Sequence, residues 1–368
     1  MDTDLVIVGA GIIGLSHAVA AVRRGLRVRI VERDSRAVGA SVRNFGHCCL
    51  TAQPDELVEL AQSSREHWLK IAADADLAAQ EAGAYVVARG GAELGLLEEF
   101  AAQRSGVELK TGSEMAAVLT GGERDPAGLI GGAYFPGDLR VDPRTTAARI
   151  AAWLQAQGVR IDWRTACLGV GDGVVHTTRG HIRAEHALVC VGHDVDQLLP
   201  EVADAAGLVR CALQMALVDG PAGFTSHAAV LTATSMLRYG GMAAMPSAAE
   251  VRCLLRESSP ELLEMVANVM CAARPDGTLL VGDSHAYDLS HEPFLDEQIS
   301  ARLLAEIAAV FGVPELRVRQ RWQGVYASCP DRDLLIEQLD PRTTVVSVTS
   351  GVGMTLSFGL GEQTLAGL

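Results

Sequence analysis

The amino-acid sequence predicts an α/β fold (α+β overall), in which a domain that begins with a strand–turn–helix unit is interrupted by a second domain built on a mixed, mainly antiparallel sheet. Three observations support this prediction. A glycine-rich turn joins a strand to a helix within residues 5–24. Apolar, strand-like runs recur at residues 186–192 and 344–348, as expected for a chain that returns twice to its first sheet. Residues 208–256 alternate as antiparallel strands would.

The first element is a strand, a helix and a second strand, with the glycines between the first two. Leu5–Val8 has the pattern of a buried strand, and the apolar residues that follow have helical spacing until Gly25. Gly9 would permit the tight turn, Gly11 the close approach of a diphosphate, and Gly14 the packing of the helix on the strand. This context is the one that a Rossmann-type dinucleotide fingerprint requires.

The helix start and the end of the second strand supply the polar contacts of such a site. Ile12 and Ile13 begin the helix, whose free N–H groups and partial positive charge would favour a diphosphate. Glu32 follows the second strand, and its carboxylate would accept hydrogen bonds from ribose hydroxyls. Its neighbour Arg33 joins the candidate set. A glycine-rich unit without any ligand is the alternative.

The remaining elements follow from periodicity and turn residues. Residues 39–47 form a polar, glycine-rich turn, and Pro143 opens a helix. Further helices are expected at 55–72, 93–104, 143–157, 260–273 and 295–311, with another from Met354 onward, and strands at 26–31 and 85–89. The predicted dinucleotide-binding domain comprises residues 1–80, 140–206 and 318–368. The predicted substrate domain comprises residues 81–139 and 207–317.

Composition limits the partners of the chain. The 368 residues carry a formal net charge of −14, which argues against nucleic-acid and anionic-membrane partners. No apolar run approaches the length of a membrane span, and Asp2 and Asp4 replace the basic start of a signal peptide. The eight cysteines include no C-x-x-C pair, which fits buried thiols in a reducing cytoplasm. We therefore expect a cytoplasmic protein, with its oligomeric state left open.

The order of the strands favours FAD over NAD as the dinucleotide. NAD-dependent dehydrogenases usually continue with regular βα repeats, whereas this chain leaves for a polar turn and returns twice. The second return ends in TSGVGMTLSFG (residues 349–359), which places Gly351 and Gly353 at the start of a helix. Such a helix start would suit the electron-rich end of a reduced flavin. An ordinary glycine-rich turn is the alternative.

These motifs occur in an order that resembles the FAD-dependent amine oxidoreductases, the superfamily of D-amino-acid oxidase, glycine oxidase and sarcosine oxidase. The resemblance covers essentially the whole chain. Its motifs are the fingerprint from Gly9 to Glu32, GASVRNFGH (39–47), VDP (141–143), LVCVG (188–192) and SGVGMT (350–355). Within the superfamily, RNFGH (43–47), MLRYGG (236–241), LLVGDSHAY (279–287) and RWQGVYASCPDRD (321–333) resemble a bacterial subfamily associated with phosphonate breakdown. That subfamily is implied to oxidise the C–N bond of aminoethylphosphonate-type amines.

Two departures from the superfamily pattern qualify what the resemblance implies. Sarcosine oxidases attach FAD through a cysteine near the position matched by Gly324, whereas Cys329 is out of register, so we expect non-covalent FAD. The same enzymes hold the substrate carboxylate with a lysine where this chain has Thr355, and no lysine follows Lys110. The electron acceptor is therefore left open, as oxygen or another acceptor.

An arginine is the candidate for the anionic end of the substrate. Arg238, followed by Tyr239, carries a guanidinium that can bind a phosphonate or carboxylate through two parallel N–H bonds. A surface arginine on a strand is the alternative. We assign substrate contacts to Arg238, Tyr239, Trp322 and Thr355.

The catalytic candidates are side chains that could accept a proton or wall the flavin. His47 and His285 are candidates for a proton acceptor or a second anion contact, with a structural role as the alternative. Tyr326 and Trp322 are expected beside the flavin, with plain core packing as the alternative. We assign catalytic roles to His47, His285 and Tyr326, and no metal. The candidate FAD-binding residues are Gly9, Gly11, Ile12, Ile13, Gly14, Glu32, Arg33, Ser41, Asn44, Gly46, Cys167, Cys190, Gly192, Gly324, Gly351, Gly353, Met354 and Thr355.

The expected function is the FAD-dependent oxidation of the C–N bond of a small anionic amine, an amino-phosphonate or amino acid. Hydride transfer to flavin would give an imine, which hydrolyses to an aldehyde or keto acid. A flavin-dependent 2-hydroxyacid dehydrogenase is one alternative, and an FAD-binding subunit of a hetero-oligomeric dehydrogenase is another. A flavin monooxygenase is disfavoured because we find no second G-x-G-x-x-G for NADPH.

Overall fold

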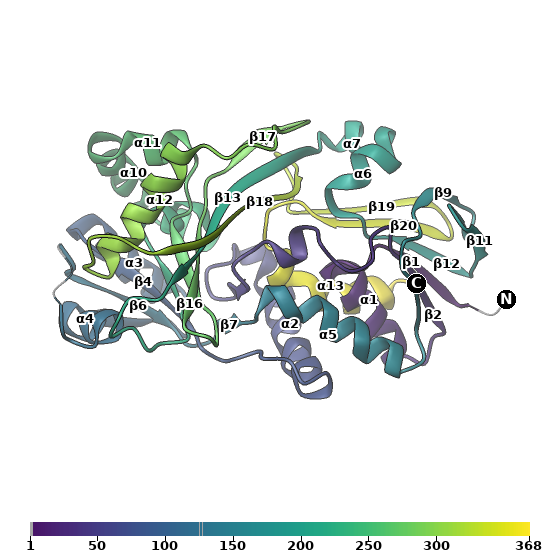
Figure 1. The fold of residues 1–368 in the computed structure, drawn as a ribbon, viewed down its shortest axis with the longest axis horizontal. Coiled ribbons are helices and arrows are strands. Elements are labelled where there is room, and N and C mark those ends of the chain that lie inside the picture. Colours follow the sequence, from purple (N-terminus) through teal and green to yellow (C-terminus); the bar gives the residue numbers. More distant parts are fainter. Residues whose placement is uncertain (1–2, 125, 127) are drawn as a thin grey trace.

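The computed structural model describes residues 3–124, 126 and 128–368. Two sheets with their helices lie side by side, and both chain ends lie on the side of the first sheet (Figure 1). The predicted α/β fold, with a dinucleotide-type sheet and a second, mainly antiparallel sheet, is confirmed. Among the described residues, none of the helices combines the length and the apolar character needed to cross a membrane.

The first sheet has six strands within the described ranges. Their order is β19 (Leu334–Asp340), β20 (Thr343–Val348), β12 (His186–Val189), β1 (Leu5–Val8), β2 (Val28–Val31) and β8 (Arg160–Asp162). Neighbouring strands are parallel except β19, which is antiparallel to β20. The two predicted returns of the chain, β12 and β20, therefore lie next to each other beside β1.

The two faces of the first sheet are covered differently because successive side chains of a strand point to opposite faces. Leu5 and Ile7 of β1 pack in a core with residues of the helices α1 (Ile12–Arg23), α2 (Asp55–Asp74), α5 (Pro143–Ala156) and α13 (Gly353–Ala366). Val6 and Val8 pack on a small antiparallel sheet made of β9 (Cys167–Gly171), β10 (Val174–Thr177) and β11 (Gly180–Arg183).

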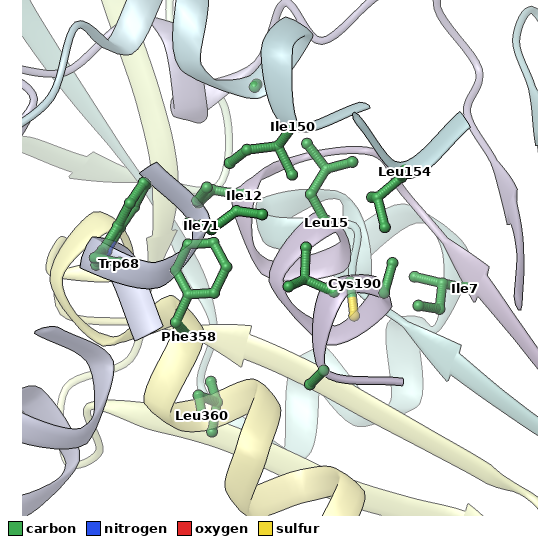
Figure 2. Packing of buried hydrophobic residues seen from close by; sticks show 14 of the residues in the cluster. Ile7, Ile12, Leu15, Trp68, Ile71, Ile150, Leu154, Cys190, Phe358 and Leu360 are labelled. Atoms are coloured by element: carbon green, nitrogen blue, oxygen red, sulfur yellow. The ribbon is translucent and has the colours of Figure 1, made fainter. Parts of the chain in front are cut away.

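The helical core fixes the start of α13. Side chains of α2 and α13 gather beside those of α1 (Figure 2). The Trp68 and Phe358 rings are 4.6 Å apart edge to face, and the Trp68 indole N–H donates to the Met354 carbonyl at 2.8 Å. Ser16 donates from its hydroxyl to the Ser357 carbonyl at 2.8 Å. These buried contacts fix the first turns of α13 against α1 and α2.

The second sheet is larger and mainly antiparallel. In the described part of the chain its order is β17 (Ala286–Asp288), β13 (Val209–Asp219), β16 (Thr278–Gly282), β15 (Met270–Ala273), β14 (Ala229–Leu231), β4 (Ala84–Ala88), β6 (Gly131–Phe135) and β5 (Glu108–Thr111). β18 (Val318–Ser328) pairs with β13 and also contacts β20. The domain boundary predicted at residue 318 therefore assigns a strand of the second sheet to the first domain.

The remaining elements connect or cover these sheets. Between the sheets, β3 (His47–Cys48) pairs with β7 (Leu139–Arg140). The other helices are η1 (Ala40–Val42), α3 (Gly91–Gln103), α4 (Gly112–Thr120), η2 (Gly192–Asp194), α6 (Val195–Leu198), α7 (Pro200–Ala206), α8 (Ala233–Arg238), α9 (Gly240–Ala243), α10 (Ala248–Ser258), α11 (Pro260–Glu264) and α12 (Glu297–Val310).

Two sequence predictions for the second domain are wrong. Residues 208–256 are antiparallel strands only as far as β14, and then form α8, α9 and α10. Ala248 and Val251 are buried on one side of α10, a spacing of three residues that is helical and not the alternation of a strand. The helix predicted at 260–273 ends with α11, and Met270–Ala273 is instead a strand, β15. A short apolar run between two strands does not distinguish a helix from a buried strand.

Candidate functional site

A cavity of about 570 Å³ lies where the two sheets meet. The first sheet contributes the glycine turn after β1, the end of β2 and the loop between β20 and α13. The second contributes the end of α8, the segment after β16 and the middle of β18. Ligand sites in open α/β sheets lie at the carboxyl ends of the strands, and β1, β2 and β20 all end at this cavity.

The glycine turn has the close contacts that its sequence predicts. Gly9 has φ of +105°, and a Cβ there would lie 2.4 Å from the Cys190 carbonyl oxygen. A Cβ on Gly14 would lie 2.0 Å from the Gly9 carbonyl oxygen, so the helix packs directly on the turn, outside the cavity. Gly11 lines the cavity, and beside it the Ile12 N–H donates to the Ser41 hydroxyl at 2.8 Å.

The acid after β2 faces the same cavity. Glu32 accepts hydrogen bonds from the backbone N–H of Ala10 (2.7 Å) and of Asp34 (3.0 Å). Arg33 lies at the rim and forms an ion pair with Asp194 at 2.7 Å. The carboxylate is therefore held in place by the backbone of the turn, next to the N-terminus of α1.

Most of the residues that we predict from the sequence line this cavity together. Gly14, Gly46 and Trp322 do not. Gly46 has φ of +70° and packs against the Val141 carbonyl, while the Trp322 indole donates to the Arg43 carbonyl at 3.1 Å. The predicted residues that line the cavity are Gly9, Gly11, Ile12, Ile13, Glu32, Arg33, Ser41, Asn44, His47, Cys167, Cys190, Gly192, Arg238, Tyr239, His285, Gly324, Tyr326, Gly351, Gly353, Met354 and Thr355.

The loop before α13 brings the two halves of the cavity together. Gly351 has φ of +80°, and a Cβ there would lie 3.1 Å from the Tyr326 hydroxyl and 3.3 Å from Nη2 of Arg238. α13 begins at Gly353 with no side-chain cap among the described residues, so its first N–H groups are free to bind a ligand. Thr355 in its first turn is buried.

Arg238 is held by one edge of its guanidinium. Its Nη2 donates to the Ser350 carbonyl at 2.9 Å and to the Tyr326 hydroxyl at 3.3 Å. Within the described ranges, no carboxylate pairs with it and no partner is bonded to its other nitrogens. Burial lowers the pKa of Arg238, but the neighbouring tyrosines, Tyr326 first, raise it, and the net direction is upward. The side chain is therefore a permanent cation with free donors, located at the end of the helix α8 and not on the expected strand.

Tyr239 packs beside Arg238 as an uncharged aromatic wall. Its hydroxyl donates to the Met270 sulfur at 3.6 Å, and its ring meets the His47 ring edge to face at 6.3 Å. Burial raises the pKa of Tyr239 well above its usual value.

His47 belongs to a buried hydrogen-bond network. Its Nε2 bonds Oδ2 of Asp138 at 2.8 Å, and Oδ1 of Asp138 accepts from the Leu50 and Thr51 N–H groups and the Thr51 hydroxyl. His47, Cys49 and Asp138 place potential metal-ligand atoms within 4.8 Å of one another. Burial raises the pKa of the Cys49 thiol well above its usual value, and the donors already on Asp138 occupy its oxygens. This arrangement favours a structural network over a metal centre.

His285 lines the cavity next to Tyr326, with the two ring centroids 6.4 Å apart. Its Nδ1 is 2.8 Å from the Val266 carbonyl, so Nδ1 carries the proton and Nε2 is left as an acceptor. Burial, reinforced by the charge of Arg238, lowers the pKa of His285 to about 3. The neutral ring favours an acceptor role over a second contact to an anion.

Two polar residues that line the cavity are not among the site residues predicted from the sequence. Asn268 precedes β15 and Asp283 follows β16, and both are buried in the cavity wall. Their backbones pair through two hydrogen bonds, of 2.8 and 3.0 Å. The motif LLVGDSHAY drew attention to His285 alone, although an acid directly after a buried strand is also a signal of a functional residue.

Comparison with known families gives one match. A family model described as FAD dependent oxidoreductase matches residues 4–366, which is nearly the whole chain. No match to a curated protein was found.

Solved structures match the fold over its full length. Glycine oxidase from Geobacillus kaustophilus aligns with a TM-score of 0.78 at 19% identity, covering 100% of this chain and 94% of that one. Glycine oxidase from Bacillus cereus aligns with a TM-score of 0.77 at 18% identity, covering 98% and 93%. Iminodiacetate oxidase from Chelativorans sp. BNC1 aligns with a TM-score of 0.75 at 18% identity, covering 99% and 95%. At these identities the likeness is one of fold.

Proposed function

Since the chain belongs to the family of FAD-dependent oxidoreductases, we propose that it oxidises the C–N bond of a small amine that carries a phosphonate or carboxylate group. The observation on which the substrate class rests is Arg238, a cation held by one edge in the cavity with its other donors free. The proposed substrates are amino-phosphonates of the aminoethylphosphonate type, which the sequence motifs favour, and amino acids. Three proteins of similar fold are named for the oxidation of glycine or iminodiacetate.

The residues of the first sheet fit an FAD molecule. The side-chain-free surfaces of Gly9 and Gly11 leave room for a diphosphate at the N-terminus of α1, and Glu32 offers a carboxylate to the adenosine ribose. The uncapped N-terminus of α13 would face the pyrimidine end of the flavin. When bound, FAD supplies the hydride acceptor for the carbon next to nitrogen. We propose that attachment is non-covalent, because Cys329 does not line the cavity.

The chain's own residues orient the substrate. Arg238 would bind the anionic end of the substrate through two parallel N–H bonds, because the Tyr326 hydroxyl and the Ser350 carbonyl bond only to Nη2. Tyr239 and Tyr326 would shield that contact from water, and His285 would offer a neutral acceptor. We further propose that residues 1–80, 140–206 and 318–368 form the FAD-binding domain and that residues 81–139 and 207–317 form the substrate domain. The eight cysteines, none in a disulfide within the described ranges, favour the cytoplasm.

A substrate panel with variants of Arg238 tests this function. Aminoethylphosphonate, its N-methyl derivative, sarcosine, glycine, D-alanine and a 2-hydroxy acid are each assayed aerobically for peroxide and anaerobically with a dye acceptor. Arg238→Ala is expected to raise KM far more than it lowers kcat. A buried charged contact to a ligand is worth about 2–5 kcal/mol, or about 30-fold to several thousand-fold in kcat/KM. Arg238→Lys should recover only part of this loss, because an ammonium cannot reproduce the fork.

Each alternative has its own outcome in this panel. Equal activity of wild type and Arg238→Ala on every acidic amine would exclude the role of Arg238. A preference for uncharged amines would exclude an anionic substrate altogether. Turnover of the hydroxy acid alone would identify a hydroxyacid dehydrogenase. Absence of turnover by the purified FAD-loaded chain with any compound would favour a subunit of a larger dehydrogenase.

A further inference from the structure

Two buried oxygen atoms in the wall of the cavity lack hydrogen-bond donors. Oδ1 of Asp283 and Oδ1 of Asn268 have no partner among the residues that the structure describes. The two residues are 4% and 5% exposed, so bulk water does not compensate for the missing bonds. Buried acceptors of this kind are rare and cost about 1–3 kcal/mol each. A ligand with N–H or O–H donors would satisfy both.

The two residues are held rigidly at one level of the second sheet. β15 and β16 pair in antiparallel fashion from Met270 opposite Gly282, and the backbone pair of Asn268 with Asp283 continues this ladder. The backbone N–H and C=O groups of both residues are hydrogen-bonded in this ladder, so neither side chain projects from an unpaired loop. The two acceptors are therefore part of a preorganised wall.

The charged groups around Asp283 and Asn268 indicate the charge of the ligand group that would bind there. Arg238 lines the same cavity, yet in the described part of the chain its hydrogen bonds go to Tyr326 and Ser350 and no ion pair joins it to Asp283. Burial raises the pKa of Asp283 to about 7, although Arg238 and a side-chain hydrogen bond with Asn268 lower it. A cation beside the carboxylate would restore its charge. One cavity thus contains a guanidinium and a carboxyl group that do not form an ion pair with each other.

We infer that Asp283 and Asn268 form the amine-binding half of the substrate site, opposite the anion-binding Arg238. The ligand is then a dipolar molecule, with a primary or secondary ammonium whose N–H groups donate to both oxygens and with a phosphonate or carboxylate at the other end. The inference rests on the proposed function and specifies its substrate class. It distinguishes amines from the hydroxy acids, which carry one O–H donor and no positive charge at that position.

The test compares ligands that differ only in the amine. Binding to the dithionite-reduced holoenzyme is measured by anaerobic calorimetry, because reduced flavin leaves the amine intact. Aminoethylphosphonate is paired with propylphosphonate and glycine with propionate, so that a methyl group replaces the ammonium. Wild type should bind the dipolar member at least about 10-fold more tightly, as expected for an ammonium bonded to a buried carboxylate. Asp283→Asn should abolish most of this preference, and Asn268→Ser part of it.

Controls separate this inference from the proposed function. Asp204→Asn removes the same charge from the exposed surface of α7 and should leave both affinities unchanged. Arg238→Ala should weaken both members of a pair. Equal wild-type affinity for both members would overturn the role of Asp283 and Asn268 while leaving the anion site intact. Absence of binding by every anion would instead contradict the proposed function.

The binding test can still be decided if the Asp283→Asn variant folds poorly. Retained flavin and unchanged propylphosphonate affinity show that Asp283→Asn is folded, and a preserved preference for the amine in that variant would overturn the inference. If Asp283→Asn loses its flavin, the preference for the amine is measured in Asn268→Ser and in wild type instead. An unchanged preference in Asn268→Ser would then contradict the two-acceptor site.

Discussion

Replacement of Glu32 by Gln should weaken FAD binding without affecting FMN binding. The Glu32 carboxylate already accepts from two backbone N–H groups, of Ala10 and Asp34, at 2.7 and 3.0 Å. A carboxylate has about four acceptor positions, so it can keep both bonds and still accept from ribose hydroxyls. Gln offers one oxygen, and its NH₂ group would face a backbone donor or the ribose.

The expected loss follows from these contacts. One charge-assisted acceptor is removed, which is worth about 1–3 kcal/mol, or about 5- to 150-fold in the Kd for FAD. FMN lacks the adenosine ribose, so its affinity should change little. Both constants are measured by fluorescence titration of the deflavinated protein.

A matched control distinguishes charge from position. Glu337 lies on the exposed side of β19, away from the cavity. The variant Glu337→Gln should therefore bind FAD and FMN with wild-type affinity. Unchanged FAD affinity in Glu32→Gln would refute a ribose contact. Equal weakening of FAD and FMN would show that Glu32 acts only through the shape of the glycine turn.

Three further predictions concern stability and attachment. Asp138→Asn should lower the free energy of unfolding by about 2–4 kcal/mol, because the amide cannot accept from all the donors that the carboxylate binds; an unchanged urea midpoint would contradict this network. Acid precipitation should release the flavin into the supernatant, whereas flavin in the pellet would indicate covalent attachment. Burial lowers the pKa of His17 to about 4 from an unfolded value near 6.5, so the stability that its neutral ring contributes is complete above pH 6.5 and is lost as the pH falls towards 4. Between pH 7 and 4.5, the free energy of unfolding of His17→Gln should therefore fall by about 2–3 kcal/mol less than that of wild type, as measured by urea unfolding. An equal fall in both proteins would exclude His17 as the source of the pH dependence.

The sequence predicted more of the half of the cavity that we propose to bind the cofactor than of the half that we propose to bind the substrate. The glycine turn is a local feature, because Gly9, Gly11 and Gly14 lie within six residues and each has a separate steric reason. The substrate half depends on distant pairings. Asn268 and Asp283 meet only because β15 and β16 pair, and His47 meets Asp138 across 91 positions of the chain.

Local patterns also misassigned the element that carries Arg238. α8 spans six residues, Ala233–Arg238, which is too short for helical periodicity to differ clearly from alternation. Arg238 was nevertheless a candidate, because its guanidinium suits a phosphonate or carboxylate, and it lines the cavity. Side-chain chemistry was therefore more informative than secondary structure at this position.

The position of β20 and α13 determines when the protein can acquire its flavin. β20 pairs with β12 beside β1, and α13 packs on α1, so residues 343–366 complete a sheet and a cavity begun by residues 5–31. During translation the glycine turn leaves the ribosome more than 300 residues before Gly351 and Gly353 can join it. A nascent chain therefore carries an intact fingerprint in an open half-site. The complete cavity therefore forms only after residues 343–366 have been synthesised, and a nonsense mutation even within β20 would yield a product that lacks this side of the cavity.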